Sequence, residues 1–227
     1  RLFSTSSKNY GTNALATTAY DDGYTAGGMY YCNGTGGETR RNVTINNVIA
    51  GDKIVVYMAS SNAATGTLVF KYLGEDNEQV EKASFTNKGT KYEFVAKYSG
   101  SYKVYTDAAA GKPIYNRIVR IPGVAVSGTI DGAQLSGYKV MFKDEANGIT
   151  YDADIKGNTF TATLAAGCNY TAVLSGVAGY GFSNATKNIS TTVDEALTGK
   201  SGVTLSIEEK KVYTYTGKVT GFAADYD

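Results

Sequence analysis

The stretch Lys53-Ile54-Val55-Val56-Tyr57-Met58-Ala59 sets Ile54, Val56 and Met58 on alternate positions, which all face one side of an extended chain. The segment Thr67–Leu73 repeats this alternation. A period of two is typical of a strand that is buried on one face, and no long segment with a helical period competes with it. We therefore predict an all-β protein.

Similar segments recur through the first half of the chain, separated by turns rich in Gly, Asn, Asp and Ser. Short strands spaced about 8–12 residues apart are typical of a sandwich or jelly roll. The predicted strands of this half are Asn42–Ala50, Lys53–Ala59, Thr67–Leu73, Gln79–Phe85, Lys91–Tyr98, Ser101–Thr106 and Ile114–Ile121. The Gly- and Tyr-rich segment Lys8–Thr39 is only weakly periodic, which indicates functional loops or disorder, with room for short irregular strands.

Pro122 and Gly123 interrupt the pattern, and the strands beyond them are shorter and richer in Thr. Thr159–Leu164 alternates strictly, with Phe160, Ala162 and Leu164 on the inner side. The other predicted strands are Ala125–Ile130, Tyr138–Lys143, Ile149–Ile155, Tyr170–Ser175, Lys187–Thr192 and Val203–Ile207, with a helical turn at Asp194–Leu197. We predict a jelly-roll β-sandwich over residues 1–123, then a smaller immunoglobulin-like or transthyretin-like β-sandwich over residues 124–211.

Residues 212–227 are either a last strand with a tail or the start of a truncated further repeat. Tyr215–Gly221 aligns with Val126–Gly132, glycine to glycine and apolar to apolar, which favours a tandem array. The sequence begins at Arg1 with neither a Met nor a leader, so we expect a piece of a longer protein with covalently linked neighbouring domains.

Composition excludes several function classes. The chain has no His, which removes imidazole as a general base, triad member or zinc ligand. A net charge of +1 gives no basis for binding nucleic acid, and no apolar run is long enough for membrane insertion. Residues 1–123 carry 14 Lys and Arg against 10 Asp and Glu, a mildly basic balance that suits an acidic ligand, with ordinary surface variation as the alternative. Cys32 and Cys168 lie in different halves, so we expect two free thiols rather than a disulfide.

We predict no catalytic residues. The acidic pairs, such as Asp144-Glu145 and Asp152 with Asp154, lie in turns where carboxylates are mostly solvated, and no phosphate-loop or nucleophile-elbow motif occurs. Two separate loop segments offer clustered oxygens: Asp21 with Asp22, and Glu75–Glu78, which contains Asp76. Each suggests a structural calcium ion, with a hydrated turn as the alternative.

The chain has 19 Tyr but no Trp, so any aromatic platform must be built from tyrosine. Tyrosine rings stack on sugars, while Arg and Lys pair with carboxylates and hydroxyls. Such side chains gather in and after the Gly-rich segment, and they predict a surface for an acidic polysaccharide. The alternative is that about half of these tyrosines are core residues with only the hydroxyl exposed. The predicted binding residues are Tyr24, Tyr30, Tyr31, Arg40, Arg41, Lys71 and Tyr72.

The first half resembles jelly-roll modules of the carbohydrate-binding type, most closely those attached to clostridial pectate lyases and other pectin-degrading proteins. The resemblance rests on strand patterning over Arg41–Thr44, Gly51–Tyr57, Gly66–Phe70, Gly100–Tyr105 and Gly111–Gly123. It implies a module that binds pectin or another uronate-containing glycan.

The second half resembles the carboxypeptidase-regulatory or pilin-B-type sandwich repeats of bacterial surface proteins, through Val126–Gly132, Phe160–Leu164 and Gly167–Leu174. These repeats are commonly spacers. Some related domains carry a Lys–Asn isopeptide crosslink with a buried acid, for which Lys139, Asn188 and Asp152 are the candidates here.

The leading hypothesis is a non-catalytic, polysaccharide-binding region of a secreted or surface-attached bacterial protein. Two alternatives stay open. One is a purely structural pair of spacers without a ligand, and the other is a β-sandwich enzyme that acts on carbohydrate through carboxylates.

Overall fold

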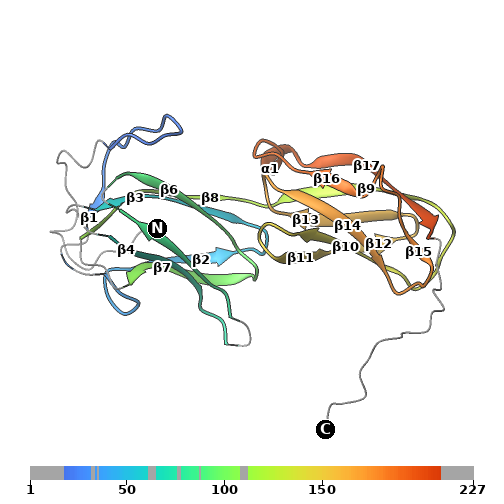
Figure 1. The fold of residues 1–227 in the computed structure, drawn as a ribbon, viewed down its shortest axis with the longest axis horizontal. Helices are drawn as coiled ribbons and strands as arrows, with labels where there is room; N and C mark the ends of the chain where they lie inside the picture. The colour runs from blue at the N-terminus through green and yellow to red at the C-terminus, as the bar shows by residue number, and fades with distance from the viewer. Residues whose placement is uncertain are drawn as a thin grey trace, which may run out of the picture.

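The computed structural model describes residues 18–31, 34, 36–60, 65–75, 78–86, 88–107 and 112–210, with the side chain of Tyr31 excepted. The all-β prediction is confirmed: strands dominate, and α1 (Glu195–Thr198) is the one helix in these ranges. Figure 1 shows two β-sandwiches arranged along the long axis and joined where β8 leads into β9. Within the described ranges, no helix has the length and apolar character needed to cross a membrane.

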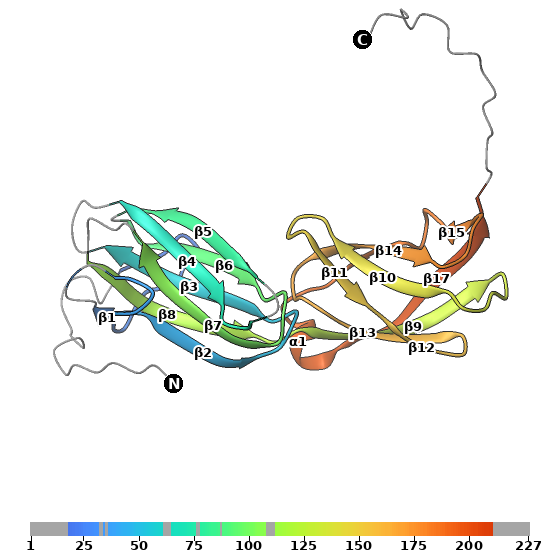
Figure 2. The same ribbon diagram turned by 90° about the horizontal axis from the view of Figure 1, so that it is seen from below.

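The first sandwich is a jelly roll made of two antiparallel four-stranded sheets. One sheet has the order β1 (Tyr30–Tyr31), β8 (Pro113–Ile121), β3 (Lys53–Ser60) and β6 (Thr90–Val95). The other has the order β2 (Val43–Val48), β7 (Gly100–Asp107), β4 (Gly66–Tyr72) and β5 (Val80–Phe85). Because the chain passes repeatedly from one sheet to the other, neighbours in each sheet come from distant parts of the sequence (Figure 2).

The core of this sandwich confirms the alternation predicted for β3 and β4. Ile54, Val56 and Met58 are fully buried between the sheets. Phe70 of β4 stacks on Tyr102 of β7 at a centroid distance of 4.5 Å, which adds ring–ring attraction to the burial of apolar area. The other face of β3 is buried too, because residues 18–28 cover it, so β3 has no solvated side.

The second sandwich contains a four-stranded and a five-stranded sheet. The first has the order β11 (Ile149–Asp152), β10 (Lys139–Asp144), β14 (Asn169–Ser175) and β16 (Asn188–Ser190). The second has the order β12 (Asp154–Lys156), β13 (Thr159–Leu164), β9 (Val124–Gly132), β17 (Lys200–Glu209) and β15 (Tyr180–Phe182). Its first and last long strands, β9 and β17, run parallel, while the other pairs are antiparallel.

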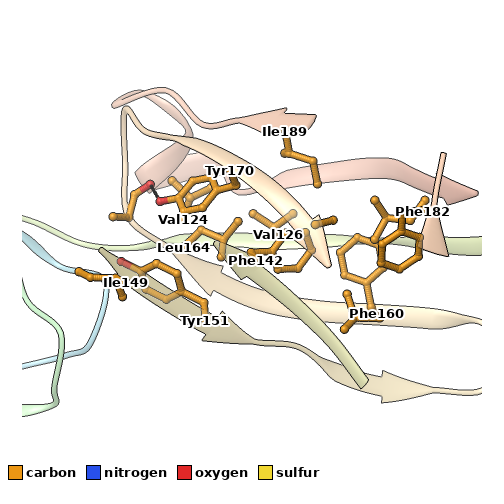
Figure 3. Close-up of a cluster of buried hydrophobic side chains, with 14 of the residues drawn as sticks. Val124, Val126, Phe142, Ile149, Tyr151, Phe160, Leu164, Tyr170, Phe182 and Ile189 are labelled. Carbon is orange, nitrogen blue, oxygen red and sulfur yellow. Dashed lines mark hydrogen bonds between the residues drawn. The ribbon is translucent and has the colours of Figure 1, made fainter. Parts of the chain in front are cut away.

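The core of the second sandwich is drawn in Figure 3. Phe160 and Leu164 are buried and Ala162 packs against them, as the strict alternation of β13 predicts. Gly128 on β9 lies between Phe160 and Val203, and a Cβ at this position would collide with the Val203 carbonyl. The close parallel pairing of β9 with β17 therefore requires glycine at this point.

One predicted strand differs from the structure, and two short strands were not predicted. The strand predicted at Ile149–Ile155 is broken at Ala153, whose N–H donates to the Val140 carbonyl at 3.0 Å while the chain crosses to the other sheet. The short strands β1 and β15 were not predicted individually, because two or three residues carry no readable period. Residues 215–221, which align with part of β9, lie outside the described residues.

The two sandwiches meet at a buried carboxylate. Asp52, only 1% exposed, accepts hydrogen bonds from Ile49 N at 2.7 Å, from Gly123 N at 3.2 Å and from the Arg120 side chain. Gly51 beside it has φ +91° and lies against Tyr151 of the second sandwich. Val95 of β6 belongs to the apolar core of the second sandwich. The β2–β3 turn is therefore held against Arg120 and Gly123, where β8 leads into β9.

Candidate functional site

The structure separates the predicted binding residues. Tyr30, 6% exposed, lies in the core and stacks on Tyr115 at 6.1 Å, so its ring has no free face for a sugar. Tyr72 also packs against the core, and its hydroxyl donates to the Ser99 carbonyl at 3.1 Å. Strand alternation turns both rings inward, which corrects the expectation of one continuous tyrosine surface.

Lys71 lies on the outer face of the β2-β7-β4-β5 sheet. Its ammonium group pairs with Glu38 at 2.8 Å, and this contact lowers the pKa of Glu38 and raises the pKa of Lys71. Arg40 is exposed on the same loop as Glu38. Arg41, which follows it, has φ 52°, an uncommon conformation for a residue other than glycine. The charge of Lys71 is thus already balanced within the protein.

Tyr24 lies on the opposite sheet, over the outer face of β3. It stacks on Tyr20 at 5.6 Å and meets Tyr57 edge-on at 4.8 Å. The Tyr20 hydroxyl donates to Asn116 Oδ1 at 2.7 Å, which fastens the 18–28 segment to β8. Burial raises the pKa of Tyr20 and also of Tyr57. The three rings form a tyrosine cluster that is partly open to solvent at Tyr24.

Arg117 of β8 completes this cluster. Its guanidinium carbon lies 5.0 Å from the centre of the Tyr24 ring and 5.7 Å from that of Tyr57. Arg117 is exposed, and no carboxylate of the described residues forms an ion pair with it. A guanidinium that packs on rings keeps N–H groups at its edge, which suit a carboxylate held by two parallel hydrogen bonds.

Asp22 and Lys91 form the neighbouring edge of the cluster. The Tyr57 hydroxyl donates to Asp22 Oδ2 at 2.8 Å, and this bond is the main reason that the pKa of Asp22 is lowered. The Tyr24 N–H donates to the other oxygen at 3.2 Å, and Lys91 Nζ lies 3.5 Å away. Lys91 also pairs with Glu93 at 3.1 Å, a contact that raises the pKa of Lys91. Asp22 thus holds the Tyr57 hydroxyl and the Tyr24 backbone in place by hydrogen bonds.

The calcium hypothesis gains no support from the described residues. Asp22 uses both oxygens for protein donors and has a lysine beside it, and Asp21 is exposed. Within the ranges that the structure describes, no group of three or more Cys, His, Asp or Glu side chains could hold a metal ion. Asp76 lies outside those ranges, so its part in the hypothesis stays a prediction.

Arg117 and Tyr57 were not among the predicted binding residues. Tyr57 lies on the outer side of the alternating segment that starts at Lys53, a position where a large ring indicates a covered or functional face. Arg117 lies directly opposite Tyr57 across the β3–β8 pair. That register depends on strand pairing over about sixty positions of sequence, which no local pattern reveals.

The isopeptide hypothesis is wrong for this trio. Lys139, Asn188 and Asp152 are all exposed, so Asp152 is not the buried acid that the crosslink needs. Lys139 pairs with Ser175 and Asn188 with Thr171 along the same strand, β14. Four residues along a strand separate these positions by roughly 13 Å, far beyond the reach of a side-chain bond.

Cys168 is a free thiol, as expected, and burial raises its pKa, so the thiol form is favoured. Cys32 lies outside the described residues. Of the carboxylates considered for catalysis, Asp144 is buried and accepts hydrogen bonds from Asn147, including one at 2.7 Å from Nδ2. It therefore has a structural partner that closes the β10–β11 turn.

Comparison with known proteins finds no protein-family model that matches the chain and no curated protein that matches it.

Proposed function

We propose that the first sandwich binds an acidic polysaccharide, without catalysis, as part of a secreted or surface-attached bacterial protein. The observation that carries the proposal is Arg117: an exposed guanidinium on a rigid strand, packed on Tyr24 and Tyr57, with no ion-pair partner among the described residues. A uronate-containing chain such as pectin supplies carboxylates, to which the guanidinium can donate paired hydrogen bonds.

The geometry changes the expected mode of binding. Arg117 covers part of the Tyr24 ring, and Tyr20 stacks on that ring as well. Charge pairing at Arg117 is thus the main interaction, and the ring edges of Tyr24 and Tyr57 add apolar contact with a sugar. A single arginine at an exposed site binds weakly, so retention depends on repeated contacts along a polymer.

Affinity electrophoresis tests this proposal with gels that contain homogalacturonan, rhamnogalacturonan, xylan or starch. We expect retardation by the uronate polymers that decreases as salt is raised, because the exposed charge pair is screened. Arg117→Ala should abolish the retardation, while Arg117→Lys should keep part of it, since lysine retains the charge and loses the planar fork.

Arg40→Ala is the matched control. Arg40 is also exposed, but it lies on the loop whose Glu38 pairs with Lys71 of β4, in the other sheet from β3 and β8. We expect this variant to migrate like the unmodified chain in every gel. Unchanged mobility of the unmodified chain in all gels, with calcium present, would overturn the proposal. Equal losses in Arg117→Ala and Arg40→Ala would contradict the assigned site.

A second candidate function, a spacer, is favoured by the junction. Asp52 joins the β2–β3 turn, Arg120 and Gly123 through buried hydrogen bonds, and Val95 enters the core of the other sandwich. This arrangement suits two modules that hold a fixed direction. A small-angle scattering profile that matches an end-to-end pair of rigid sandwiches would support this role, and a profile of independently tumbling units would contradict it.

A further inference from the structure

Both sandwiches contribute to a polar groove at their junction, with a volume of about 490 Å³. Ala50 and Lys97 come from the first sandwich, and β9, β11, β12 and β13 supply the remaining walls. Volumes of roughly 300–1,000 Å³ are typical of small-ligand sites. This groove is separate from the tyrosine cluster, whose residues do not line it.

Hydroxyl groups line the floor of the groove. Thr161 on β13 lies directly opposite Ser127 on β9, and Thr163 follows two positions along on the same face. Opposite residues in an antiparallel pair are about 5 Å apart at Cβ, and residues two apart on a strand are about 7 Å apart. The three hydroxyls therefore form a compact array of donors and acceptors.

Carboxylates and one lysine form the rim. Asp152 ends β11 and Asp154 begins β12, so the break at Ala153 brings acids from two different sheets to one groove. Lys97 lines the groove from the first sandwich, with its Nζ 5.6 Å from the centre of the Tyr98 ring, and its backbone N–H donates to Gln79 Oε1 at 2.7 Å. The rim thus carries two negative charges and one positive charge, which disfavours an anionic ligand.

The Ser, Thr and Asp side chains of the groove have no hydrogen-bond or ion-pair partner within the described protein. None of the groove residues Ser127, Thr150, Asp152, Asp154, Thr161 and Thr163 takes part in a side-chain hydrogen bond or ion pair there. By contrast, Thr159, on the same strand but outside the groove, donates to the Lys156 carbonyl at 2.8 Å. The donors and acceptors of the groove are therefore free for a ligand.

Backbone groups add to this set. β12 pairs with β13 only over Thr159–Thr161, so among the described strands the Ala162–Leu164 edge has no neighbour on that side. This free edge is short, and residues of the first sandwich bound the groove beside it. An added strand therefore has too little room to pair stably. A compact ligand rich in hydroxyls fits it better than an extended peptide.

From these observations we infer that the junction groove binds a neutral saccharide. Carboxylates accept hydrogen bonds from pairs of adjacent sugar hydroxyls, and the Thr and Ser hydroxyls both donate and accept. The ligand differs in charge from the one proposed for Arg117, so the chain would hold two kinds of sugar at separate sites. Asp152 and Asp154 are both exposed, unlike a general acid held in an apolar pocket, so we infer binding without hydrolysis.

Titration followed by amide NMR tests this inference on the full chain. The probes are neutral oligosaccharides derived from cellulose, xylan, galactan and arabinan, with oligogalacturonate as the anionic comparison. We expect one neutral probe to shift the amide signals of Ser127, Thr161 and Thr163 in a saturable way, with Kd on the order of 1 mM. Oligogalacturonate should leave these signals unchanged.

The double variant Thr161→Val and Thr163→Val removes two hydroxyls and keeps β-branched side chains on the strand, so it should fold normally. We expect it to weaken binding by about tenfold or more, which corresponds to about 1.4 kcal/mol. Asp152→Asn provides a second variant with an unchanged shape, and it should also weaken binding. Thr159→Val is the matched control outside the groove and should bind as the unmodified chain does.

Arg117→Ala separates this inference from the proposed function, since it should bind the neutral probe normally. Absence of shifts for all neutral probes at about 10 mM would overturn the inference, as would equal weakening by Thr159→Val. Concentration-dependent dimers in light scattering, with broadening confined to Ala162–Leu164, would identify strand addition by a second copy and would also overturn it. Release of new reducing ends from a probe would contradict the non-catalytic assignment.

Discussion

The two sandwiches of this chain use their outer faces differently. In the first, the outer side of β3 is covered by Tyr20 and Tyr24, and charged side chains such as Lys91 and Glu93 follow along β6. In the second, the outer side of β13 and β9 carries small hydroxyl residues such as Thr161 and Ser127. The larger side chains of the first sandwich need partners, while the small ones of the second remain solvated.

This difference shows how one architecture separates stability from recognition. In both sandwiches, the inward residues alternate and form an apolar core. The outward residues do not enter the core, and here one set is aromatic and charged and the other is hydroxylic. The same strand period thus permits two surfaces with different ligand chemistry.

The largest expected effect on stability comes from removing one buried ring from each core in turn. Phe70→Ala and Phe142→Ala both remove a fully buried ring, and each should lower the free energy of unfolding by about 4 kcal/mol. Hydrogen exchange should show lost protection in β3, β4 and β7 for the first variant, and in β10, β13 and β14 for the second. Equal losses in both sandwiches for either variant would mean that the two units unfold as one.

A smaller effect is expected at the junction. Asp52→Ala leaves the Arg120 side chain and the Ile49 and Gly123 N–H groups without their acceptor, which should cost about 3 kcal/mol. Urea unfolding followed by tyrosine fluorescence should then resolve two transitions further apart than in the unmodified chain. Asp131→Ala removes an exposed carboxylate from β9 and serves as the control, with a change within about 0.5 kcal/mol.

The smallest effect concerns the cover over β3 and its dependence on pH. The Tyr57 hydroxyl, the Tyr24 N–H and Lys91 lower the pKa of Asp22 in the folded state. Asp22 therefore stabilises the fold above its unfolded pKa of about 3.9, and this contribution is lost as the pH falls through the lower folded value. We expect the Tyr20 and Tyr24 signals in NMR spectra to change in that acidic range.

Tyr57→Phe removes the main cause of this shift while it keeps the ring in place. The pKa of Asp22, followed by carboxyl NMR, should rise toward about 3.9 in this variant. The Glu195 carboxylate is the internal control, because its pKa is lowered mainly by Lys200 in the other sandwich and should not change. An unchanged Asp22 value would show that the Tyr57 hydroxyl does not hold this carboxylate.

The sequence could predict those parts of the fold that depend on local periodicity. Thr159–Leu164 was predicted with the bounds that the structure has, because six residues alternate without a break. Ile149–Ile155 was predicted as one strand, because the crossing at Ala153 depends on a hydrogen bond to Val140, ten or more positions away. The two-residue strand β1 exists only through its pairing with β8.

The candidate sites were less accessible to prediction than the fold. Tyr24 was identified from composition, but its partner Arg117 lies over ninety positions further along the chain. Tyr30 was predicted for a surface, but it is buried. Sequence alone does not tell an inward tyrosine from an outward one until the strand register is known. The groove at the junction needs both sandwiches in place, so no single segment of the sequence indicates it.

The alternation that starts at Lys53 determined that this protein is built from strands with one apolar face, since side chains on a strand alternate whatever surrounds it. The absence of His determined which chemistries are excluded. Only the tertiary structure decided that Tyr57 meets Arg117, that Asp52 joins the two sandwiches and that Thr161 shares a groove with Asp152. Such contacts depend on strand register and on the meeting of two cores, which are set by the packing of distant segments rather than by local sequence.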